Sequence, residues 1–360
     1  MLVIIPTYKR LDSLYWVLYS LMNCDLPILD KKPKVAIANN FSPNENAINE
    51  IILRIKSEFK NSDQWKWEIL NREITLPPVQ NWYDTVFELA EENELVYFVG
   101  DDDPLPKKSI LERYIRVTKN NDLFIFGKLH SVFFTKKSNK ILLLENPKLS
   151  TNPKTTKVDY NNFLNCTTIH ISNHCFKFDE RFASSYRKAM TWCSKLEYVD
   201  FNARTLFIPL FIPLAALTLN YPIVFIDNVV IFRGMSIQEI GSSKNGIANW
   251  DLGFISLAAY VIIKITPEIE KIDLLNDLKI DLLSTYKNYY YSTRLNKKID
   301  KVMLHKLEKE AGFDKHQLSF KNYSRNMFFI LKNMFRINGI TLKLKALKDA
   351  INANGFFLEN

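Results

Sequence analysis

The chain has 360 residues, of which 47% are hydrophobic and 13% aromatic, and its formal net charge is +9 at pH 7. This length and composition suit one large globular core or two smaller ones and argue against intrinsic disorder. The positive charge favours an anionic partner, such as a nucleotide, a phospholipid surface or a nucleic acid.

Cysteine content and hydropathy indicate the compartment. The chain has four cysteines, too few for a disulfide framework at this length, and its N-terminus has no signal-peptide pattern. The longest apolar stretch, residues 206–219, is shorter than the roughly 20 residues that a membrane-spanning helix needs, and Pro209 and Pro213 interrupt it. We therefore expect a cytoplasmic protein without a transmembrane helix.

Strand and helix signals alternate through the N-terminal part of the chain. Short β-rich runs predict strands at 2–5, 35–38, 65–70 and 95–99, and apolar side chains at helical spacing predict helices around 14–21, 48–59 and 79–92. Such alternation predicts an α/β fold in which helices cover a parallel sheet. In sheets of this kind, ligands bind outside the carboxyl ends of the strands.

Three polar turns follow predicted strands and are expected to meet at one edge of the sheet. They are residues 6–10, 39–44 and 100–103, and the last contains Asp101, Asp102 and Asp103, here called the Asp cluster. Carboxylates this close repel one another unless a cation neutralises them, and oxygen ligands suit Mg²⁺ or Mn²⁺ better than zinc. The cluster therefore predicts a divalent cation that holds a diphosphate. The alternative is a solvated acidic turn.

Four short motifs in this region occur in the order in which a known enzyme family has them. Residues 3–10 (VIIPTYKR) resemble the opening of family 2 glycosyltransferases, enzymes of the GT-A fold that use nucleotide sugars, and residues 39–42 (NNFS) are similar to the Asp-Asn-x-Ser turn of that family. Residues 80–82 (QNW) resemble an Asn-Trp pair of one bacterial branch, and the Asp cluster stands where the family has its Asp-x-Asp motif. The resemblance implies a Rossmann-like mixed sheet flanked by helices.

The resemblance also implies roles for individual residues. Asn39 stands where the family usually has an Asp that contacts the base, and an amide can both donate and accept there. Asp101 and Asp103 would bracket the metal and the ribose, with Asp103 as the first choice for a direct metal ligand. Pro6, Thr7 and Tyr8 would line the base and ribose, and Arg10 would lie near the phosphates. The donor-binding residues implied in this way are Pro6, Thr7, Tyr8, Arg10, Asn39, Asn81, Asp101 and Asp102.

A second group of motifs concerns the catalytic base. Residues 178–182 (FDERF) resemble a Phe-Asp-Glu-x-Phe segment that, in the family, precedes a Glu-Asp pair on a helix. A helix here would place Glu197, Asp200 and Arg204 on one face, but Tyr198 occupies the usual position of the base. An inverting transfer needs a carboxylate to accept the proton of the acceptor hydroxyl. We expect Asp200 in this role, with Glu197 second. The alternative is a surface helix whose acids pair with Arg204.

Two cysteines and two histidines lie close together between residues 166 and 175. The intervening residues favour a strand, which would hold these side chains too far apart to share a zinc ion. One histidine, His170 or His174, could instead complete the shell of the catalytic metal.

The resemblance covers about residues 1–245, with a nucleotide-binding half at 1–106 and an acceptor half at 107–245, and residues 246–360 are expected to be mostly helical. Residues 319–348 carry seven Lys or Arg and no acid, interleaved with aromatic side chains. This pattern favours contact with an anionic membrane surface, although a packed helical subdomain with solvated lysines has the same composition. No nucleic-acid-binding motif is present, so we expect no nucleic acid partner.

These features predict a metal-dependent, inverting glycosyltransferase. It would move a sugar from a nucleotide diphosphate, most often UDP in the resembling family, to a glycan or lipid-linked glycan of a growing bacterial surface polysaccharide such as lipopolysaccharide, O-antigen or capsule. The expected location is the cytoplasm or the cytoplasmic face of the inner membrane. A non-catalytic GT-A-like module that binds glycan or scaffolds a biosynthetic complex is the alternative, and Tyr198 favours it. A sugar-phosphate nucleotidyltransferase is disfavoured because residues 1–20 contain no glycine for a phosphate loop.

Overall fold

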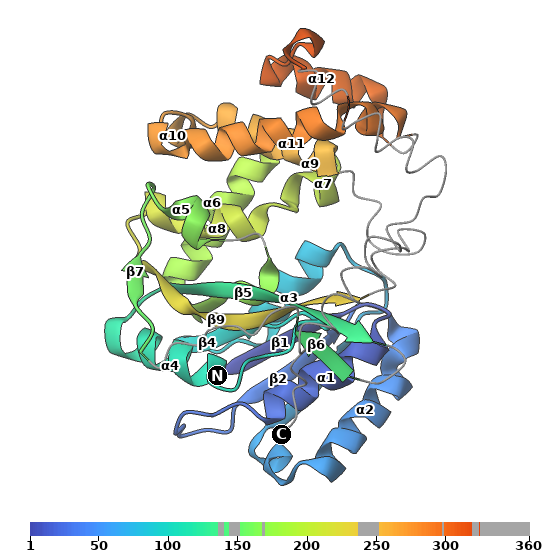
Figure 1. The fold of residues 1–360 in the computed structure, drawn as a ribbon, viewed down its shortest axis with the longest axis vertical. Coiled ribbons are helices and arrows are strands. Elements are labelled where there is room, and N and C mark those ends of the chain that lie inside the picture. Colours follow the sequence, from blue (N-terminus) through green and yellow to red (C-terminus); the bar gives the residue numbers. More distant parts are fainter. Residues whose placement is uncertain are drawn as a thin grey trace. The chain divides into compact units, whose positions relative to one another are not determined.

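The computed structural model describes residues 1–135, 140–143, 152–167, 170–236, 252–296, 299–318 and 324. They form two compact units (Figure 1). The first unit contains Met1–Tyr186 and Pro209–Ser236. The second contains Arg187–Ile208 and the described residues that follow Ser236.

The first unit begins with the alternation of strands and helices that the sequence predicts. The strands are β1 (Leu2–Thr7), β2 (Lys34–Asn39), β3 (Lys66–Asn71) and β4 (Glu94–Phe98), and the helices between them are α1 (Leu11–Met22), α2 (Glu45–Glu58) and α3 (Pro78–Leu89). The remaining strands and helices of this unit are α4 (Ser109–Asn120), β5 (Phe124–Thr135), β6 (Lys140–Leu143), β7 (Thr155–Lys157), α5 (Phe163–Cys166), β8 (Cys175–Phe178), the first part of α6 (Glu180–Ser194), most of α8 (Ile208–Thr218) and β9 (Ile223–Ser236).

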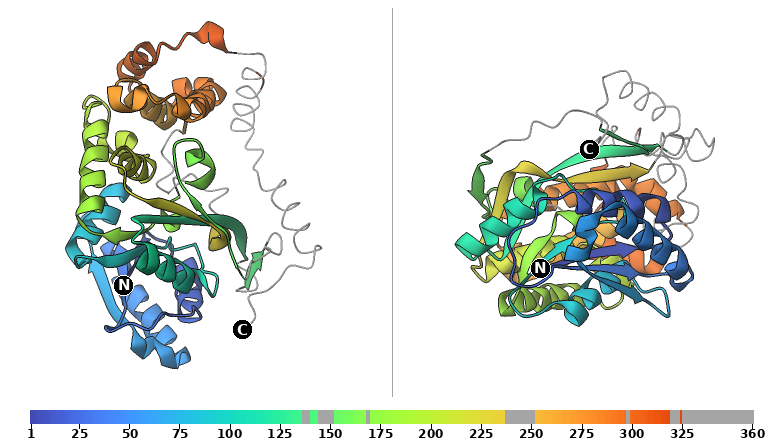
Figure 2. Two further views of the ribbon diagram at one scale, coloured as in Figure 1. Left: turned by 90° about the vertical axis from the view of Figure 1, so that its left-hand side faces the viewer. Right: turned by 90° about the horizontal axis from the view of Figure 1, so that it is seen from below.

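A single sheet organises this unit. In the described part of the chain it has nine strands in the order β3-β2-β1-β4-β8-β5-β9-β7, and β6 pairs with β5. The first four strands run parallel, whereas β8 runs antiparallel to both β4 and β5. The prediction of a mixed α/β sheet is therefore confirmed, and Figure 2 shows helices on both of its faces.

Apolar side chains fill both faces of the sheet. On one face, alternate strand residues such as Val3 and Ile5 pack against the apolar stripes of α1, α2 and α4. On the other face α3 contacts β1 and β2, and Tyr83 of α3 packs edge-to-face on Phe98 at 5.6 Å. Burial of both faces explains why these strands are continuous apolar runs.

Strand β1 continues two residues past its predicted end, through Pro6 to Thr7. Its pairing with β4 ends at Ile4, whereas its pairing with β2 continues to Thr7. Pro6 therefore lies where β1 has one paired neighbour, a position at which a strand tolerates the missing N–H. This extension brings the polar residues after Pro6 to the edge of the sheet.

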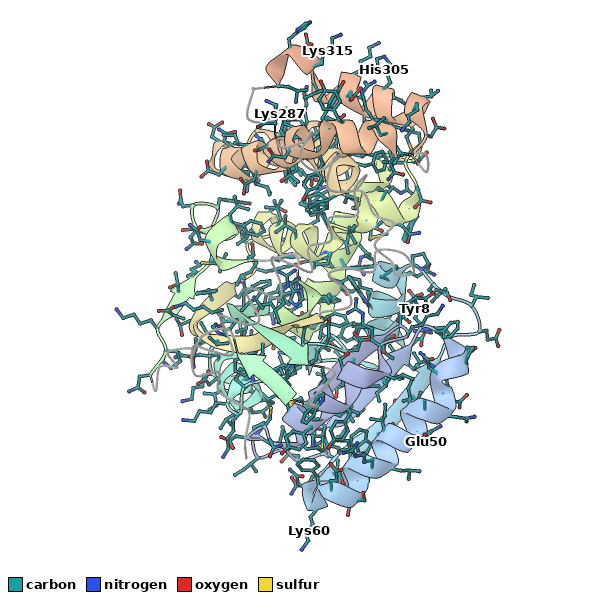
Figure 3. The ribbon with its side chains drawn as sticks, turned by 45° about the vertical axis from the view of Figure 1, so that its right-hand side comes forward. Tyr8, Glu50, Lys60, Lys287, His305 and Lys315 are labelled. Atoms are coloured by element: carbon teal, nitrogen blue, oxygen red, sulfur yellow. The ribbon has the colours of Figure 1, made fainter. Side chains whose placement is uncertain are left out.

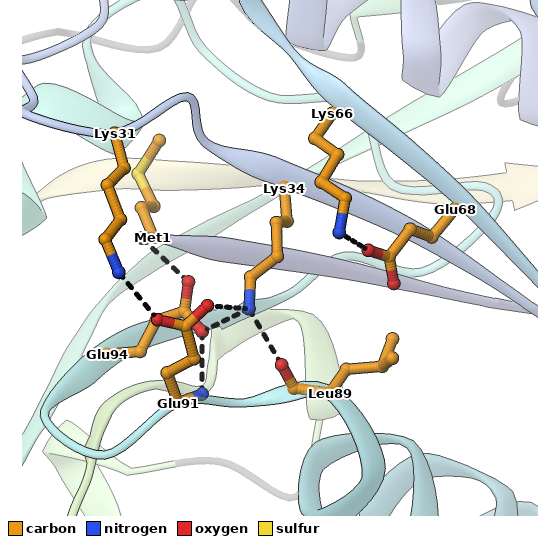
Figure 4. A network of polar contacts seen from close by, with 8 residues as sticks. All are labelled: Met1, Lys31, Lys34, Lys66, Glu68, Leu89, Glu91 and Glu94. Atoms are coloured by element: carbon orange, nitrogen blue, oxygen red, sulfur yellow. Dashed lines mark hydrogen bonds and ion pairs between the residues drawn. The ribbon is translucent and has the colours of Figure 1, made fainter.

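An ion-pair network joins the amino ends of the parallel strands (Figure 4). Lys34, at the start of β2, places its Nζ 2.8 Å from Glu94 Oε2 at the start of β4, and it donates to the Leu89 carbonyl at 2.8 Å. Because β1 lies between β2 and β4, these bonds link two strands that are not neighbours. The amino ends of the strands are thus held together by charge, at the end opposite to the Asp cluster.

The second unit is helical in its described residues. Its helices are the end of α6, α7 (Phe201–Thr205), α9 (Leu252–Lys264), α10 (Pro267–Glu270), α11 (Asn276–Leu295) and α12 (Lys301–Ala311). Both α11 and α12 contact α9, which is buried along most of its length. Glu308 of α12 is buried and accepts a hydrogen bond from the Tyr286 hydroxyl of α11, so one buried acid joins two helices.

Among the described residues, no helix combines the length and the hydropathy needed to cross a membrane. Apart from Ser324, the basic and aromatic segment 319–348 lies outside the described residues. Membrane contact by this segment therefore stays a prediction.

Candidate functional site

The three polar turns meet at the carboxyl ends of β1, β2 and β4, as predicted. Tyr8, which follows β1 (Figure 3), packs edge-to-face on Phe41, with ring centroids 5.8 Å apart. The Thr7 hydroxyl donates to Asp101 Oδ2 at 2.7 Å, and the Thr7 carbonyl accepts from the Asn40 amide at 3.0 Å. Residues from all three turns are therefore in direct contact.

Asp101 and Asp102 are bridged by the guanidinium of Arg10. Arg10 Nη1 lies 3.3 Å from Asp101 Oδ1 and 2.9 Å from Asp102 Oδ2, and the Arg10 side chain is 41% exposed. The Asp101 side chain also accepts from the Tyr8 amide at 3.3 Å. Arg10 thus supplies part of the positive charge that these carboxylates need, and its contact with donor phosphates stays a prediction.

Asp103 is held by residues that are distant in sequence. Its side chain is 2% exposed, lies 2.8 Å from His170 Nε2, and accepts a hydrogen bond from the Ser172 hydroxyl. The sequence indicated His170 as a candidate, but it did not indicate Ser172. A Ser-Asn pair is typical of a turn, so it gives no direct indication of a functional site.

The strand predicted across residues 166–175 is wrong. Helix α5 ends at Cys166, a 3₁₀ helix, η3, covers Ile171–Asn173, and β8 begins at Cys175. The amide of Asn173 bonds both backbone groups of Gly127, donating to its carbonyl at 2.8 Å and accepting from its N–H at 3.1 Å. Such side-chain bonds to the backbone stabilise a turn here in place of a strand ladder.

Asn39 is fully buried, and both ends of its amide are hydrogen-bonded within the protein. Its Nδ2 donates to Asn71 Oδ1 at 2.7 Å, and its Oδ1 accepts from the Phe41 amide at 3.2 Å. Asn39 therefore shapes the turn that carries Phe41, and its contact with a base stays a prediction. Beside it, Lys9 has a positive φ of 61° and places its ammonium 4.2 Å from the Phe41 ring centroid.

Asn81, the residue implied by the Asn-Trp pair, joins α3 to the sheet. Its Nδ2 donates to the Ala38 carbonyl at 3.2 Å, and its Oδ1 accepts from Arg72 Nε at 3.0 Å. The side chain is 1% exposed. These contacts give Asn81 a structural task at the end of β2, next to the Asn39 turn.

The helix predicted to carry Glu197, Asp200 and Arg204 on one face is also wrong. Helix α6 ends at Ser194 and α7 begins at Phe201. Asp200 is the N-cap of α7, and its Oδ1 accepts from the Asn202 amide at 2.9 Å. Aspartate is a preferred N-cap because it satisfies an amide of the first turn, and this signal was present in the sequence. The role of either acid as catalytic base stays a prediction.

The FDERF motif has a clear structural basis at the start of α6. Asp179 Oδ1 accepts from the backbone N–H groups of Arg181 and Phe182, at 2.9 and 3.3 Å. The Phe182 ring is fully buried and stacks on Phe176, with ring centroids 4.0 Å apart. The motif therefore begins a helix and fills the core beneath β8.

The Asp cluster suits a metal ion that arrives with its ligand. Across the described residues, no three His, Cys, Asp or Glu side chains are arranged to hold a metal ion. Mg²⁺ is commonly bound by one or two carboxylates together with substrate phosphates, without a complete protein cage. Asp103 and Asp101 offer such carboxylates, so the residues fit a metal–diphosphate complex.

Comparison with known proteins shows similarity at the level of fold. No protein-family model and no curated protein matches the chain. Among solved structures, TarS from S. aureus has 14% identity and a TM-score of 0.50, and the match covers 86% of this chain and 48% of TarS. The two chains share a fold. This chain spans about half the length of that TarS chain.

Two structures of a shorter TarS chain also match. TarS 1–349 in complex with UDP has 15% identity and a TM-score of 0.47, with 86% of this chain and 78% of that chain covered. TarS 1–349 in complex with UDP-GlcNAc has 15% identity and a TM-score of 0.45, with 86% and 79% covered.

Proposed function

We propose that this chain is a nucleotide-sugar glycosyltransferase of the GT-A type. The observation that carries the proposal is the Asp cluster, buried at the carboxyl end of β4 and hydrogen-bonded to Thr7 at the end of β1 and to Tyr8 after it. This is the edge at which parallel α/β sheets bind nucleotides. Concentrating carboxylates there is costly unless cations neutralise them, and Arg10 supplies only part of that positive charge.

The residues at this edge divide into groups with different tasks. Tyr8 and Phe41, whose rings pack together, would contact the base, while Asp101 orders Thr7 and Tyr8 through its hydrogen bonds. Asp103 and Asp101 would hold Mn²⁺ or Mg²⁺, which supplies charge stabilisation of the leaving diphosphate when it is bound. Arg10 lies next to this position and would balance the remaining negative charge.

The transfer itself would be a single displacement with inversion. A carboxylate accepts the proton of the acceptor hydroxyl while that oxygen attacks the anomeric carbon and the bond to the diphosphate breaks. Asp200 is the first candidate for this base and Glu197 the second. In the second unit Tyr198 donates to Glu310, so the residue in the usual position of the base is bound to another helix.

We infer a glycan or lipid-linked glycan of a bacterial surface polysaccharide as acceptor. Contact with the cytoplasmic face of the inner membrane belongs to the same proposal, because residues 319–348 are strongly basic. The full chain is then expected to co-sediment with vesicles that contain anionic lipid, and a chain lacking residues 319–360 should remain in the supernatant. Equal sedimentation of both chains would refute membrane contact by this segment and leave the donor site unaffected.

Binding of nucleoside diphosphates tests the donor site directly. We expect one of them to raise the melting temperature of the full chain more in the presence of Mn²⁺ than in its absence, because the metal strengthens the binding of the diphosphate. At a ligand concentration of 100 times the dissociation constant, the stabilisation is about 2.7 kcal/mol. UDP is the first to test, since TarS 1–349 forms a complex with it. If no nucleotide raises the melting temperature, the non-catalytic module is favoured. Tyr198, which stands in the usual position of the base and donates a hydrogen bond to Glu310, also supports that module.

A further inference from the structure

A short segment around η3 reaches the Asp cluster from about 70 residues further along the chain. The Ser172 hydroxyl accepts a hydrogen bond from the Gly100 amide at 2.7 Å and donates one to Asp103 Oδ2. His170 Nε2 lies 2.8 Å from the same carboxylate oxygen. Ser172 is fully buried, so one hydroxyl connects the backbone at the start of the Asp turn with the side chain at its end.

The segment is itself fixed to two strands of the sheet. Asn173 bonds both backbone groups of Gly127 in β5, and the His174 carbonyl accepts from the Phe98 amide of β4 at 3.0 Å. Both contacts are buried, and β4 is the strand that leads into the Asp cluster. The backbone that carries Ser172 is therefore held in place on both sides. This gives the Ser172 hydroxyl a fixed position, unlike a hydroxyl on a loose loop.

Gly100 allows this contact because it has no side chain. A Cβ at this position would lie 2.9 Å from Ser172 Oγ and closer still to Asp103 Oδ2. The turn is also closed by the Asp103 amide, which donates to the Gly100 carbonyl at 3.0 Å. The close approach of backbone, hydroxyl and carboxylate thus requires glycine at residue 100.

We propose that Ser172 is a positioning residue that fixes the orientation of the Asp103 carboxylate for a metal-bound diphosphate. A carboxylate that can rotate presents its oxygens to a cation only part of the time, and the donated hydrogen bond removes that freedom. Because the same hydroxyl accepts from Gly100, it fixes the turn together with the side chain. This inference rests on the proposed function, since it requires the donor site to lie at the Asp cluster.

Replacing Ser172 by alanine in the full chain tests the inference. Isothermal titration with UDP and Mn²⁺ should show an affinity about 10- to 100-fold weaker than that of the wild type, the range for residues that orient metal ligands. UDP affinity without Mn²⁺ should be unchanged, because contacts to base and ribose do not involve Ser172. A variant that was merely less stable would lose both affinities alike.

The matched control is Ser185→Ala. Ser185 is also fully buried, but its hydroxyl donates only to the Arg181 carbonyl of its own helix, at 2.7 Å. This variant should keep the Mn²⁺-dependent affinity of the wild type. Equal Mn²⁺-dependent affinities for Ser172→Ala and the wild type would overturn the inference while leaving the proposed function in place.

Hydrogen exchange provides a second readout that needs no ligand. The amides of residues 100–103 should exchange faster in Ser172→Ala than in the wild type or in Ser185→Ala, because Gly100 loses its acceptor. If the wild type binds no nucleotide, the proposed function fails, and this exchange measurement still decides whether Ser172 holds the turn. Unchanged exchange would overturn the positioning role.

Discussion

Asp103→Ala is expected to lower the turnover of sugar transfer by at least about 100-fold, the loss typical of removing one group that stabilises developing charge. Asp103 is the acid of the cluster that is bonded to Ser172 and lies against His170. Without Asp103, the metal ion that holds the diphosphate would lose its main carboxylate ligand. The measurement is donor-dependent product formation at saturating donor and acceptor.

Two further variants make this result specific. Asp103→Asn keeps the shape and an acceptor oxygen but removes the charge, so we expect it to be impaired nearly as strongly as the alanine variant. Asp63→Ala removes an exposed acid from a different part of the same unit and should leave turnover unchanged. Wild-type turnover in Asp103→Ala would exclude the Asp cluster as the donor site.

Phe182→Ala should lower the free energy of unfolding by about 3–5 kcal/mol, the usual cost of removing a buried aromatic ring. The Phe182 ring is fully buried and stacks on Phe176 within 5° of parallel. It also lies against Phe124 and Phe178, with centroids 6.1 and 5.9 Å away. Alanine would leave a cavity between β8 and α6 that these rings cannot close.

Phe87 provides the comparison for this prediction. It belongs to the same aromatic cluster and lies 6.3 Å from Phe182, but it is 43% exposed. Phe87→Ala should therefore lose clearly less stability in urea denaturation. Similar losses for the two variants would contradict a central role for Phe182. In either variant, a large effect on nucleotide affinity is not expected, because neither ring is bonded to the Asp cluster.

The alternation of strands and helices up to β4 could be predicted because its cause is local. Apolar residues at a period of two or 3.6 are visible in the sequence, and each polar turn directly follows such a run. The meeting of Thr7 with Asp101 could be predicted for the same reason, since parallel neighbouring strands bring their ends together.

Other features depend on contacts that no local pattern encodes. Ser172 lies 69 residues from Asp103, and the Ile-Ser-Asn sequence of η3 gives no indication of that partner. The segment from Glu197 to Arg204 was predicted as one helix because it resembles a helix of family 2 glycosyltransferases, although Asp200 carries a capping signal that starts α7. In the first case the deciding interaction is tertiary, and in the second a local cap begins a new helix inside the segment.

The bonds that shape the Asp cluster also determine when this site can form during folding. Thr7 and Asp101 are 94 residues apart, and Ser172 and Asp103 are 69 apart. Contacts at such separations carry a large loop-closure cost and are made late, after the local helices and hairpins. The contact between Thr7 and Asp101 has the same sequence separation as the pairing of Leu2 with Val96, so we expect it to form together with the β1–β4 ladder. The contact between Ser172 and Asp103 is added only when η3 and β8 join β4, so the acidic turn is completed after the parallel strands that carry it have paired.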